Sequence, residues 1–489
     1  MNKALLIISA AIIVVGCGSG GSSGSSGGRG SSNEYIGSDG QIIANPRSTS
    51  FSPLQPYGMV PVPSGAYVIG QTDYEFAEQG DAAPKTITVQ SFYMDDTEVT
   101  NLEYKDFVYY VRDSIARQLL ADKVEELGLT STEDREASIA DFAFLNDESD
   151  DEDVTPYQDW LKENTNERDG GAASKKLLNW DEELYWDIES YPDVEYAEVI
   201  EGLYYPEEDR LEGVKAIDVR KLNYRFSWID NKSAAQGKYT RRSDYIITEE
   251  FNIYPDTIAW QKDFLYSYHE PMHRNYFAHE AYDNYPVVGV NWDQANAFCY
   301  YKTEKHNKYL ATKKRSAIKK VFSYRLPTES EWEFAARGGL NDAPFSWGGP
   351  YLIDDKGCYL ANFKPKRGDF IEGCTKEGGY IFTSPVRTFR PNIYGLYDMA
   401  GNVAEWTASP YEISSYNLAV NLNPDLSRLN GNLNKVVRGG SWKDFGYLIQ
   451  NSFRTFEHRD SARSYIGFRT VQTIPEGTKI KFPTKVKNR

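Results

Sequence analysis

Length, composition and charge exclude several classes of protein. The chain has 489 residues, enough for two or three ordinary domains whose cores need no disulfides. Its 54 Lys and Arg stand against 71 Asp and Glu, and the formal net charge of −17 excludes nucleic acid as a partner, because phosphate contacts need a positive surface. With 40% apolar residues, the composition indicates a globular protein rather than a multispan membrane protein or a disulfide scaffold.

The first residues indicate a secretory signal that ends at a lipid attachment site. Lys3 precedes an apolar run over residues 4–15, which is shorter than the roughly twenty residues that a membrane-spanning helix needs. The run leads into Val-Val-Gly-Cys, which resembles a bacterial lipobox, so we predict a signal peptide over residues 1–16 and acylation of Cys17. An ordinary signal peptide with an incidental cysteine is the alternative. No acid follows Cys17 directly, which favours an outer-membrane anchor that faces the periplasm.

A tether follows the predicted lipid. Between Gly18 and Ser32 the chain is almost entirely Gly and Ser, which cannot bury apolar surface. Such a segment behaves as a flexible coil with a root-mean-square span of about 20 Å. We expect ordered structure to begin near Tyr57.

The first ordered part is predicted to contain strands and then a helix. Small, apolar and turn residues alternate over 57–70, which indicates a short strand pair, and residues 86–94 alternate as a further strand. Thr100 and Glu103 then form a capping box, and apolar residues follow at helical spacing. This helix is expected to run to about Leu120.

The character of the chain changes over residues 124–281. The run Asp147–Asp153 has six acids in seven positions, which repel one another and stay solvated. Segments rich in Tyr, Trp and charge follow it. We interpret this region as a large insertion with partial order. It either carries an interface, since aromatic residues are enriched at interface centres, or it is an acidic excursion that only adds solubility.

A globular pattern resumes after Asn284. Two more capping boxes predict helices, one beginning at Asn291 and one at Thr328. The rest is punctuated by Gly, Asn and Pro, so we expect tryptophans to supply much of its core: Trp332, Trp347, Trp406 and Trp442. The patterns divide the chain into a signal peptide (1–16), a lipidated cysteine with its tether (17–56), a first domain part (57–123), an acidic Tyr-rich insertion (124–281), a second domain part (282–472) and a basic C-terminal tail (473–489).

Cysteines and histidines offer few sites for chemistry. Cys358 and Cys374 lie in a Gly-rich stretch and are the natural pair for a disulfide, which an oxidising periplasm permits. Cys299 lies in a helical pattern and is expected to be a buried thiol. Zinc would want two ligands on one helical face, and His269 and His273 have the right spacing. Pro271 interrupts them, however, so we interpret these two and His279 as surface histidines.

Six motifs occur in an order that resembles a known domain. They are residues 92–101, 285–292, 324–337, 392–406, 437–442 and 466–469. Together they resemble the formylglycine-generating-enzyme (sulfatase-modifying factor) domain. The resemblance implies an α+β fold that is irregular and C-type-lectin-like, here with a large insertion.

The resemblance also implies that the chemistry of that domain is absent. The enzymes of the family oxidise a substrate cysteine with a copper-binding pair of cysteines just after the Arg-Gly-Gly-Ser motif. The matching positions hold Asp444 and Ile449, and no cysteine follows Cys374. Copper(I) wants soft thiolate ligands, which a carboxylate and an alkyl chain do not replace. We therefore predict a pseudoenzyme that binds no copper.

Calcium is the one cofactor that the resemblance retains. Family members bind it at the segment that matches Asp398, Gly401, Val403 and Glu405, which offers two carboxylates and two carbonyls. In the alternative reading the two acids only cap turns. A second family site would use Asn362, the carbonyl of Phe363 and the region near Tyr380. It has Gly378 where the family has an Asp, so the match there is incomplete.

The combination of a lipobox, a tether and this domain without its cysteines is similar to the gliding-motility lipoproteins of Bacteroidota of the GldK/PorK type. The likeness rests on residues 92–101, 111–117 and 277–286. It implies a self-associating lipoprotein, held in outer-membrane lipid by Cys17. Such a protein would form the periplasmic ring of the type IX secretion and gliding machinery with a GldN/PorN-type partner. A sister lipoprotein of the GldJ type and a periplasmic carbohydrate-binding module are the alternatives.

Overall fold

The structure is a computed structural model, and it describes two separate units of the chain. In the first unit, residues 1–51, it describes two short strands, β1 (Tyr35–Ile36) and β2 (Ile42–Ile43), which pair antiparallel. In the second unit, residues 52–489, it describes 55–73, 75, 80–128, 139–143, 178–210, 213–264, 275–313, 320–365, 380–425, 432–475, 480 and 482. The predicted signal peptide, Cys17, the acidic run at 147–153 and most of the basic tail lie outside these residues.

The second unit mixes helices with two four-stranded sheets, which agrees with the expected α+β class. The first sheet has the order β3 (Met59–Val62), β6 (Phe92–Asp95), β14 (Val471–Thr473) and β9 (Tyr324–Arg325), and all its pairs are antiparallel. The second has the order β12 (Thr455–His458), β11 (Asn434–Arg438), β10 (Ala404–Pro410) and β13 (Ile466–Gly467), in which β10 and β13 are parallel. The first sheet joins strands from the two ends of the domain, so neither predicted part completes it alone.

The expected strand pair over residues 57–70 is wrong in its pairing. Strands β3 and β4 (Gly65–Ile69) do lie there, but they do not pair with each other. Strand β3 pairs with β6, and β4 pairs with β5 (Lys85–Val89). The predicted strand over 86–94 is accordingly two strands, because β6 leaves the hairpin to become an inner strand whose four residues are all buried.

Three long helices begin at the predicted capping boxes, which are all present. Helix α1 (Asn101–Leu127) begins after Thr100, α8 (Trp292–Thr312) after Asn291, and α9 (Glu329–Arg337) after Thr328. Helix α1 runs a further two turns past the expected end, to the left-handed Gly128, because Leu120, Ala121 and Val124 pack against α2 and α4. Within the described residues, no helix is long and apolar enough to cross a membrane.

Short elements occupy the described part of residues 124–281 and the irregular second domain part. In the first region they are α2 (Ile139–Ala143), η1 (Ile188–Ser190), α4 (Val194–Glu201), η2 (Glu207–Asp209), η4 (Val219–Lys221), β7 (Asn223–Ile229), α5 (Asn231–Ala235), η5 (Arg242–Tyr245), β8 (Ile246–Asn252), α6 (Ala259–Asp263) and η6 (Glu280–Tyr282). In the second they are α10 (Ser415–Leu418) and η7 (Gly446–Ile449).

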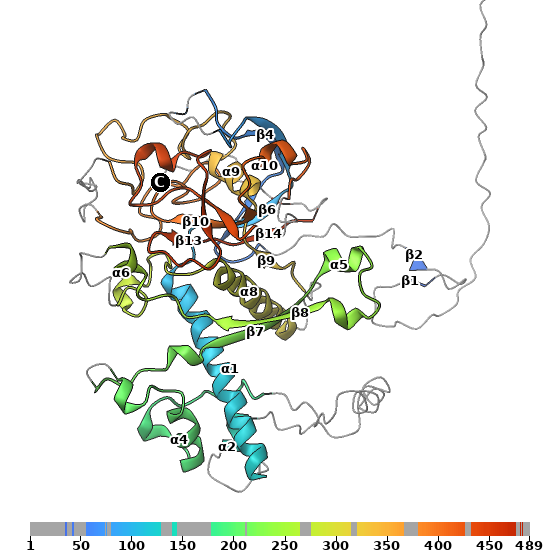
Figure 1. Cartoon of the computed structure of the whole chain (residues 1–489), viewed down its shortest axis with the longest axis vertical. Coiled ribbons are helices and arrows are strands. Elements are labelled where there is room, and N and C mark those ends of the chain that lie inside the picture. The colour runs from blue at the N-terminus through green and yellow to red at the C-terminus, as the bar shows by residue number, and fades with distance from the viewer. Residues whose placement is uncertain are drawn as a thin grey trace, which may run out of the picture. The chain divides into compact units, whose positions relative to one another are not determined.

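The region that we interpret as an insertion shares the main core. Figure 1 shows the β7–β8 hairpin crossing α8, beside α1. Tyr224 and Phe226 of β7 belong to the same buried cluster as Phe107 of α1 and Phe298 of α8. The Phe226 ring centroid lies 4.4 Å from that of Tyr300. A separate cluster joins the second half of α1 to α2, α4 and the turns beside them. Of the expected core tryptophans, Trp332, Trp406 and Trp442 are buried and Trp347 is partly buried.

Candidate functional site

The sequence motifs meet at a buried ion pair. Arg469, which follows β13, donates from Nε to Glu405 Oε2 and from Nη2 to Glu405 Oε1, both at 2.7 Å. The Arg469 side chain is 0% exposed and that of Glu405 is 1% exposed. Trp332 of α9 donates its indole N–H to Glu405 Oε2 at 2.7 Å, and Arg469 also donates to the carbonyls of Asp95 and Tyr397. Four motifs that are far apart in the sequence are thus tied to one carboxylate and one guanidinium.

Two further acids lie beside this pair with little to neutralise them. Glu98, between β6 and α1, is completely buried; its Oε1 accepts from Asn402 Nδ2 at 3.1 Å, and its Oε2 has no hydrogen-bond partner among the described residues. Burial, and next the carboxyl group of Asp398, raise the pKa of Glu98 well above its ordinary value. Burial likewise raises the pKa of Asp398 to about 6, against the lowering effect of Arg469. A proton or a cation at this place would relieve the repulsion.

The predicted calcium ligands fit this place only in part. Calcium takes six to eight oxygen ligands, and Asp398 together with the orphaned oxygen of Glu98 offers the hard oxygens that it prefers. Gly401 has a left-handed backbone (φ 79°), and a Cβ there would lie 2.3 Å from the carbonyl oxygen of Asn362, so only glycine fits. Glu405, however, gives both oxygens to Arg469 and Trp332. The described residues contain no group of three or more His, Cys, Asp or Glu placed to hold a metal.

Sequence reasoning missed Glu98. It lies inside the motif at residues 92–101, directly before the apolar Val99, and this position within a motif was the available signal. Calcium binding through Asp398, Gly401, Val403 and Glu405 stays a prediction. At the second predicted site, Asn362 is buried and donates to the carbonyl of Phe382 at 2.8 Å. Gly378 lies outside the described residues, so this second site also stays a prediction.

Asp444 and Ile449, the two positions that we match by sequence to the family's cysteines, make structural contacts. Asp444 Oδ2 accepts from the backbone N–H of Ser441 at 2.9 Å and from its hydroxyl at 2.7 Å, which closes the loop after β11. The Asp444 carbonyl accepts from Lys364 N at 2.9 Å. Ile449 is 0% exposed and packs with Phe345, Phe363 and smaller residues. Asp444 thus holds a loop in place, and Ile449 fills an apolar core.

The structure describes some of the cysteines and histidines that the sequence singled out. Cys299 is a free, buried thiol of α8, as predicted, and burial raises the pKa of its thiol well above the ordinary value. Cys358 is disulfide-bonded, and Cys374 lies outside the described residues, so the pairing of the two stays a prediction. His279 is exposed and accepts from the backbone N–H of Ala281. His269 and His273 lie outside the described residues.

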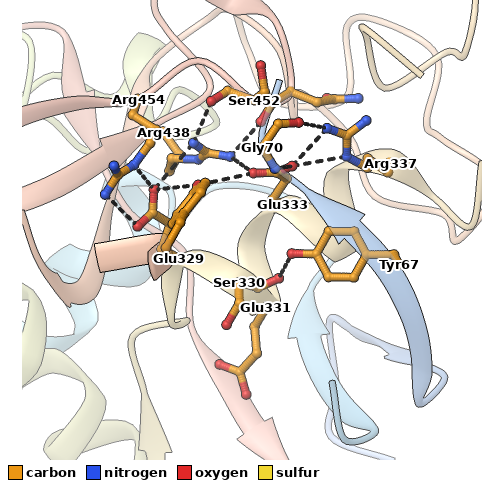
Figure 2. Close-up of polar contacts among 12 residues, drawn as sticks. Tyr67, Gly70, Glu329, Ser330, Glu331, Glu333, Arg337, Arg438, Ser452 and Arg454 are labelled. Carbon is orange, nitrogen blue, oxygen red and sulfur yellow. Dashed lines mark hydrogen bonds and ion pairs between the residues drawn. The ribbon is translucent and has the colours of Figure 1, made fainter. Parts of the chain in front are cut away.

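A second buried charge network, also missed from the sequence, attaches α9 to the Arg-Gly-Gly-Ser loop (Figure 2). Arg438 pairs with Glu333 and donates to the carbonyl of Ser452 at 2.9 Å. Arg454 donates to both oxygens of Glu329, at 2.5 and 3.0 Å. Arg337 donates to Glu333 Oε1 at 2.8 Å. These five charged residues are all buried, and they bond to one another, to backbone groups and to side chains beside them such as Tyr416 and Asp81, so the network holds the fold together.

Comparisons with known proteins agree with the motifs. The family model described as "Sulfatase-modifying factor enzyme 1-like domain" matches residues 47–474. An "Inactive C-alpha-formylglycine-generating enzyme 2" from Bos taurus is 34% identical over 196 residues, covering 38% of this chain and 49% of that protein. A "Formylglycine-generating enzyme" from Mus musculus is 33% identical over 189 residues, covering 38% and 44%. The chain thus matches about half the length of these curated relatives.

Matches to solved structures are more distant. PvdO from Pseudomonas aeruginosa is 17% identical, with a TM-score of 0.42, covering 88% of this chain and 100% of that one. CarF is 18% identical, with a TM-score of 0.35, covering 86% and 100%.

Proposed function

Because the chain belongs to the sulfatase-modifying factor enzyme 1-like family, we propose that it is a non-catalytic member whose fold serves assembly. Relatives at about a third identity include one named as a formylglycine-generating enzyme and one named as inactive, so membership alone does not decide activity. The observation that carries the proposal is the environment of Asp444 and Ile449. The Asp444 carboxylate accepts two hydrogen bonds from Ser441, and Ile449 is fully buried among apolar side chains. Neither group supplies a thiolate for copper(I).

The absence of oxidase chemistry is directly testable. A peptide that carries the cysteine motif of a sulfatase is incubated with the purified chain, with and without copper, and analysed by mass spectrometry. A formylglycine-generating enzyme that has both cysteines serves as the positive control. We expect no aldehyde from this chain, and an aldehyde product at any copper concentration would show that the proposal is wrong.

We propose that the assembly is the periplasmic ring of the type IX secretion and gliding machinery. The support comes from the sequence: the lipobox at Cys17, the Gly/Ser tether, the domain without its cysteine pair, and the likeness to lipoproteins of the GldK/PorK type. In this proposal the acylated Cys17 holds the chain on the periplasmic face of the outer membrane, and a GldN/PorN-type protein is its partner.

Co-assembly with the partner tests this role. The lipidated chain is purified with and without a GldN/PorN-type protein from the same organism, and the mass of the particles is measured. We expect a large complex when both proteins are present. If the two proteins elute separately at every ratio, the ring proposal is wrong, whereas the non-catalytic proposal is unaffected.

We also propose a structural calcium ion beside Glu98 and Asp398. Its support is the excess of buried carboxylates there and the orphaned Glu98 Oε2. The ion would add positive charge beside these two acids, because Arg469 makes its ion pair with Glu405.

A further inference from the structure

One part of the region between the domain halves is strongly acidic. Residues 178–210, here called the acidic lobe, contain twelve Asp and Glu and one Arg, a net charge of −11 within a chain of net −17. The lobe is folded, because Leu184, Tyr196 and Ile200 are buried against the second half of α1. Its acids are therefore held on a fixed scaffold.

Most acids of the lobe are exposed and unpaired. Within the described chain, three of them make ion pairs, namely Glu198 with Lys123, Glu201 with Lys215 and Asp209 with Arg220. Others, such as Glu182, Glu183 and Glu195, are exposed and make none. Apolar side chains are exposed among them: Val194 is 79% exposed and Ile188 is 61% exposed. Exposed apolar groups among unpaired like charges are typical of a surface that meets an oppositely charged partner.

The same chain exposes cations at the end of the β7–β8 hairpin, a segment whose sequence has a small excess of basic residues. Residues 230–245, here called the hairpin tip, contain two Lys and two Arg against two Asp. Lys238 and Arg241 are exposed and make no ion pair in the described chain. The tip is ordered by its two tyrosines, because Tyr239 N donates to the Tyr245 hydroxyl at 2.8 Å and their rings pack edge to face. Tyr239 is itself 42% exposed.

The two surfaces do not meet within one chain. Figure 1 shows α4 of the acidic lobe and α5 of the hairpin tip well apart in this part of the fold. In the described residues, no ion pair joins the lobe to the tip. The cations that do pair with acids of the lobe come from α1 and from residues 215–220. A contact between the two surfaces therefore requires two copies.

We propose that the acidic lobe of one copy binds the hairpin tip of the next. Such a contact joins different surfaces of identical chains, so it is heterologous and repeats from copy to copy, giving a ring if the rotation closes and a filament if it does not. The inference deepens the self-association that we propose above and rests on it. Because the charges are exposed, the contact weakens as salt rises, and Val194, Ile188 and Tyr239 supply the apolar area that charge alone does not.

Charge exchange between the surfaces tests the contact. The full chain with its lipid is studied in detergent, without any partner protein, by sedimentation velocity at low and high salt. Variant one reverses the tip (Lys238→Glu/Arg241→Glu), and variant two reverses the lobe (Glu182→Lys/Glu195→Lys). We expect each variant alone to associate at least about tenfold more weakly than the wild type at low salt, because like charges then face each other. A mixture of the two variants should associate again, because each supplies the charge that the other lacks.

A matched control separates the contact from net charge. Lys356→Glu/Arg390→Glu makes the same change of net charge as variant one at exposed positions outside both surfaces, and it should associate as the wild type does. Circular dichroism confirms that every variant is folded. Unchanged association of variant one, failure of the mixture to recover, or a wild type that stays monomeric at low salt would each overturn the contact. Co-assembly with the GldN/PorN-type protein is measured separately, so failure of the contact is distinguished from failure of the ring proposal.

Discussion

Removal of the Arg469 guanidinium should be among the most damaging single changes in the fold. We take Arg469→Met as the test, because methionine keeps much of the buried aliphatic volume and removes the charge. The change leaves Glu405, whose side chain is 1% exposed, without its cationic partner, and it removes donors from the carbonyls of Asp95 and Tyr397. It also removes the cation that lowers the pKa values of Glu98 and Asp398.

The magnitude follows from the burial of both partners. Removing one member of a buried ion pair typically costs about 3–5 kcal/mol, because the other charge stays desolvated without compensation. A domain is stable by only about 5–15 kcal/mol, so Arg469→Met is expected to forfeit a large share of the free energy of unfolding. Urea unfolding followed by tryptophan fluorescence measures the loss from the shift of the midpoint.

Two further variants show whether burial is the reason. Arg387 pairs with Asp96 at 2.6 Å, but its side chain is 54% exposed, so Arg387→Met should cost no more than about 1 kcal/mol. Adding Glu405→Gln to Arg469→Met should restore part of the loss, because a buried amide costs less without its partner than a buried carboxylate does. If Arg469→Met costs as little as Arg387→Met, the assignment of this pair as a main support of the fold is wrong.

Three other changes test the anchor, the cation and a buried acid. Cys17→Ala should move the protein from the detergent phase to the aqueous phase in phase partitioning, because the acyl chains would supply its membrane affinity; equal partitioning of both proteins contradicts lipidation. Chelation should lower the melting temperature of the wild type and leave Asp398→Asn almost unchanged, since an ion at a hundredfold excess over its Kd stabilises by about 2.7 kcal/mol; a wild-type curve that neither chelator nor added calcium shifts contradicts the site. Burial raises the pKa of Glu75 from 4.5 to about 7. Between these two pH values the folded state keeps a proton that the unfolded state has lost, so the contribution of Glu75 to stability falls as the pH rises from 4.5 to 7. Urea unfolding at pH 5 and pH 8 should show that the free energy of unfolding declines less in Glu75→Gln than in the wild type. Equal declines in the wild type and the variant contradict the raised pKa of Glu75.

Features that are decided locally could be predicted from the sequence. The three capping boxes depend on side chains three residues apart, and all three helices begin where the boxes predict. The C-terminal end of α1 depends instead on packing against α2 and α4. The sequence pattern therefore placed this end about two turns too early. The predicted pairing of β3 was wrong for the same reason. Its partner β6 lies further along the chain than β4, and nothing in the alternation of residues in β3 distinguishes β4 from β6 as its partner.

The candidate site shows the same division. Glu405, Arg469 and Trp332 all lie in the motifs, yet Glu405 and Arg469 are 64 residues apart and Glu405 and Trp332 are 73 apart, so spacing could not reveal that they touch. Glu329 and Arg438 are charged residues of the kind that usually lie on a solvated face. They are buried here because each has an oppositely charged partner in the core. Charged residues at such separations become a network only through the tertiary fold.

The motifs that mark the family therefore have more to do with folding than with chemistry. Arg438 and Glu333, like Arg469 and Glu405, are buried and paired, so the loss of any one of them would leave an uncompensated charge at a cost of about 3–5 kcal/mol. Positions 444 and 449 bear no such constraint on the charge balance of the core. A carboxylate at 444 ties the loop through Ser441, and an alkyl chain at 449 fills an apolar cluster. The buried arginines are therefore tied to the fold by charge, whereas positions 444 and 449 are tied to it only by a loop contact and by apolar packing.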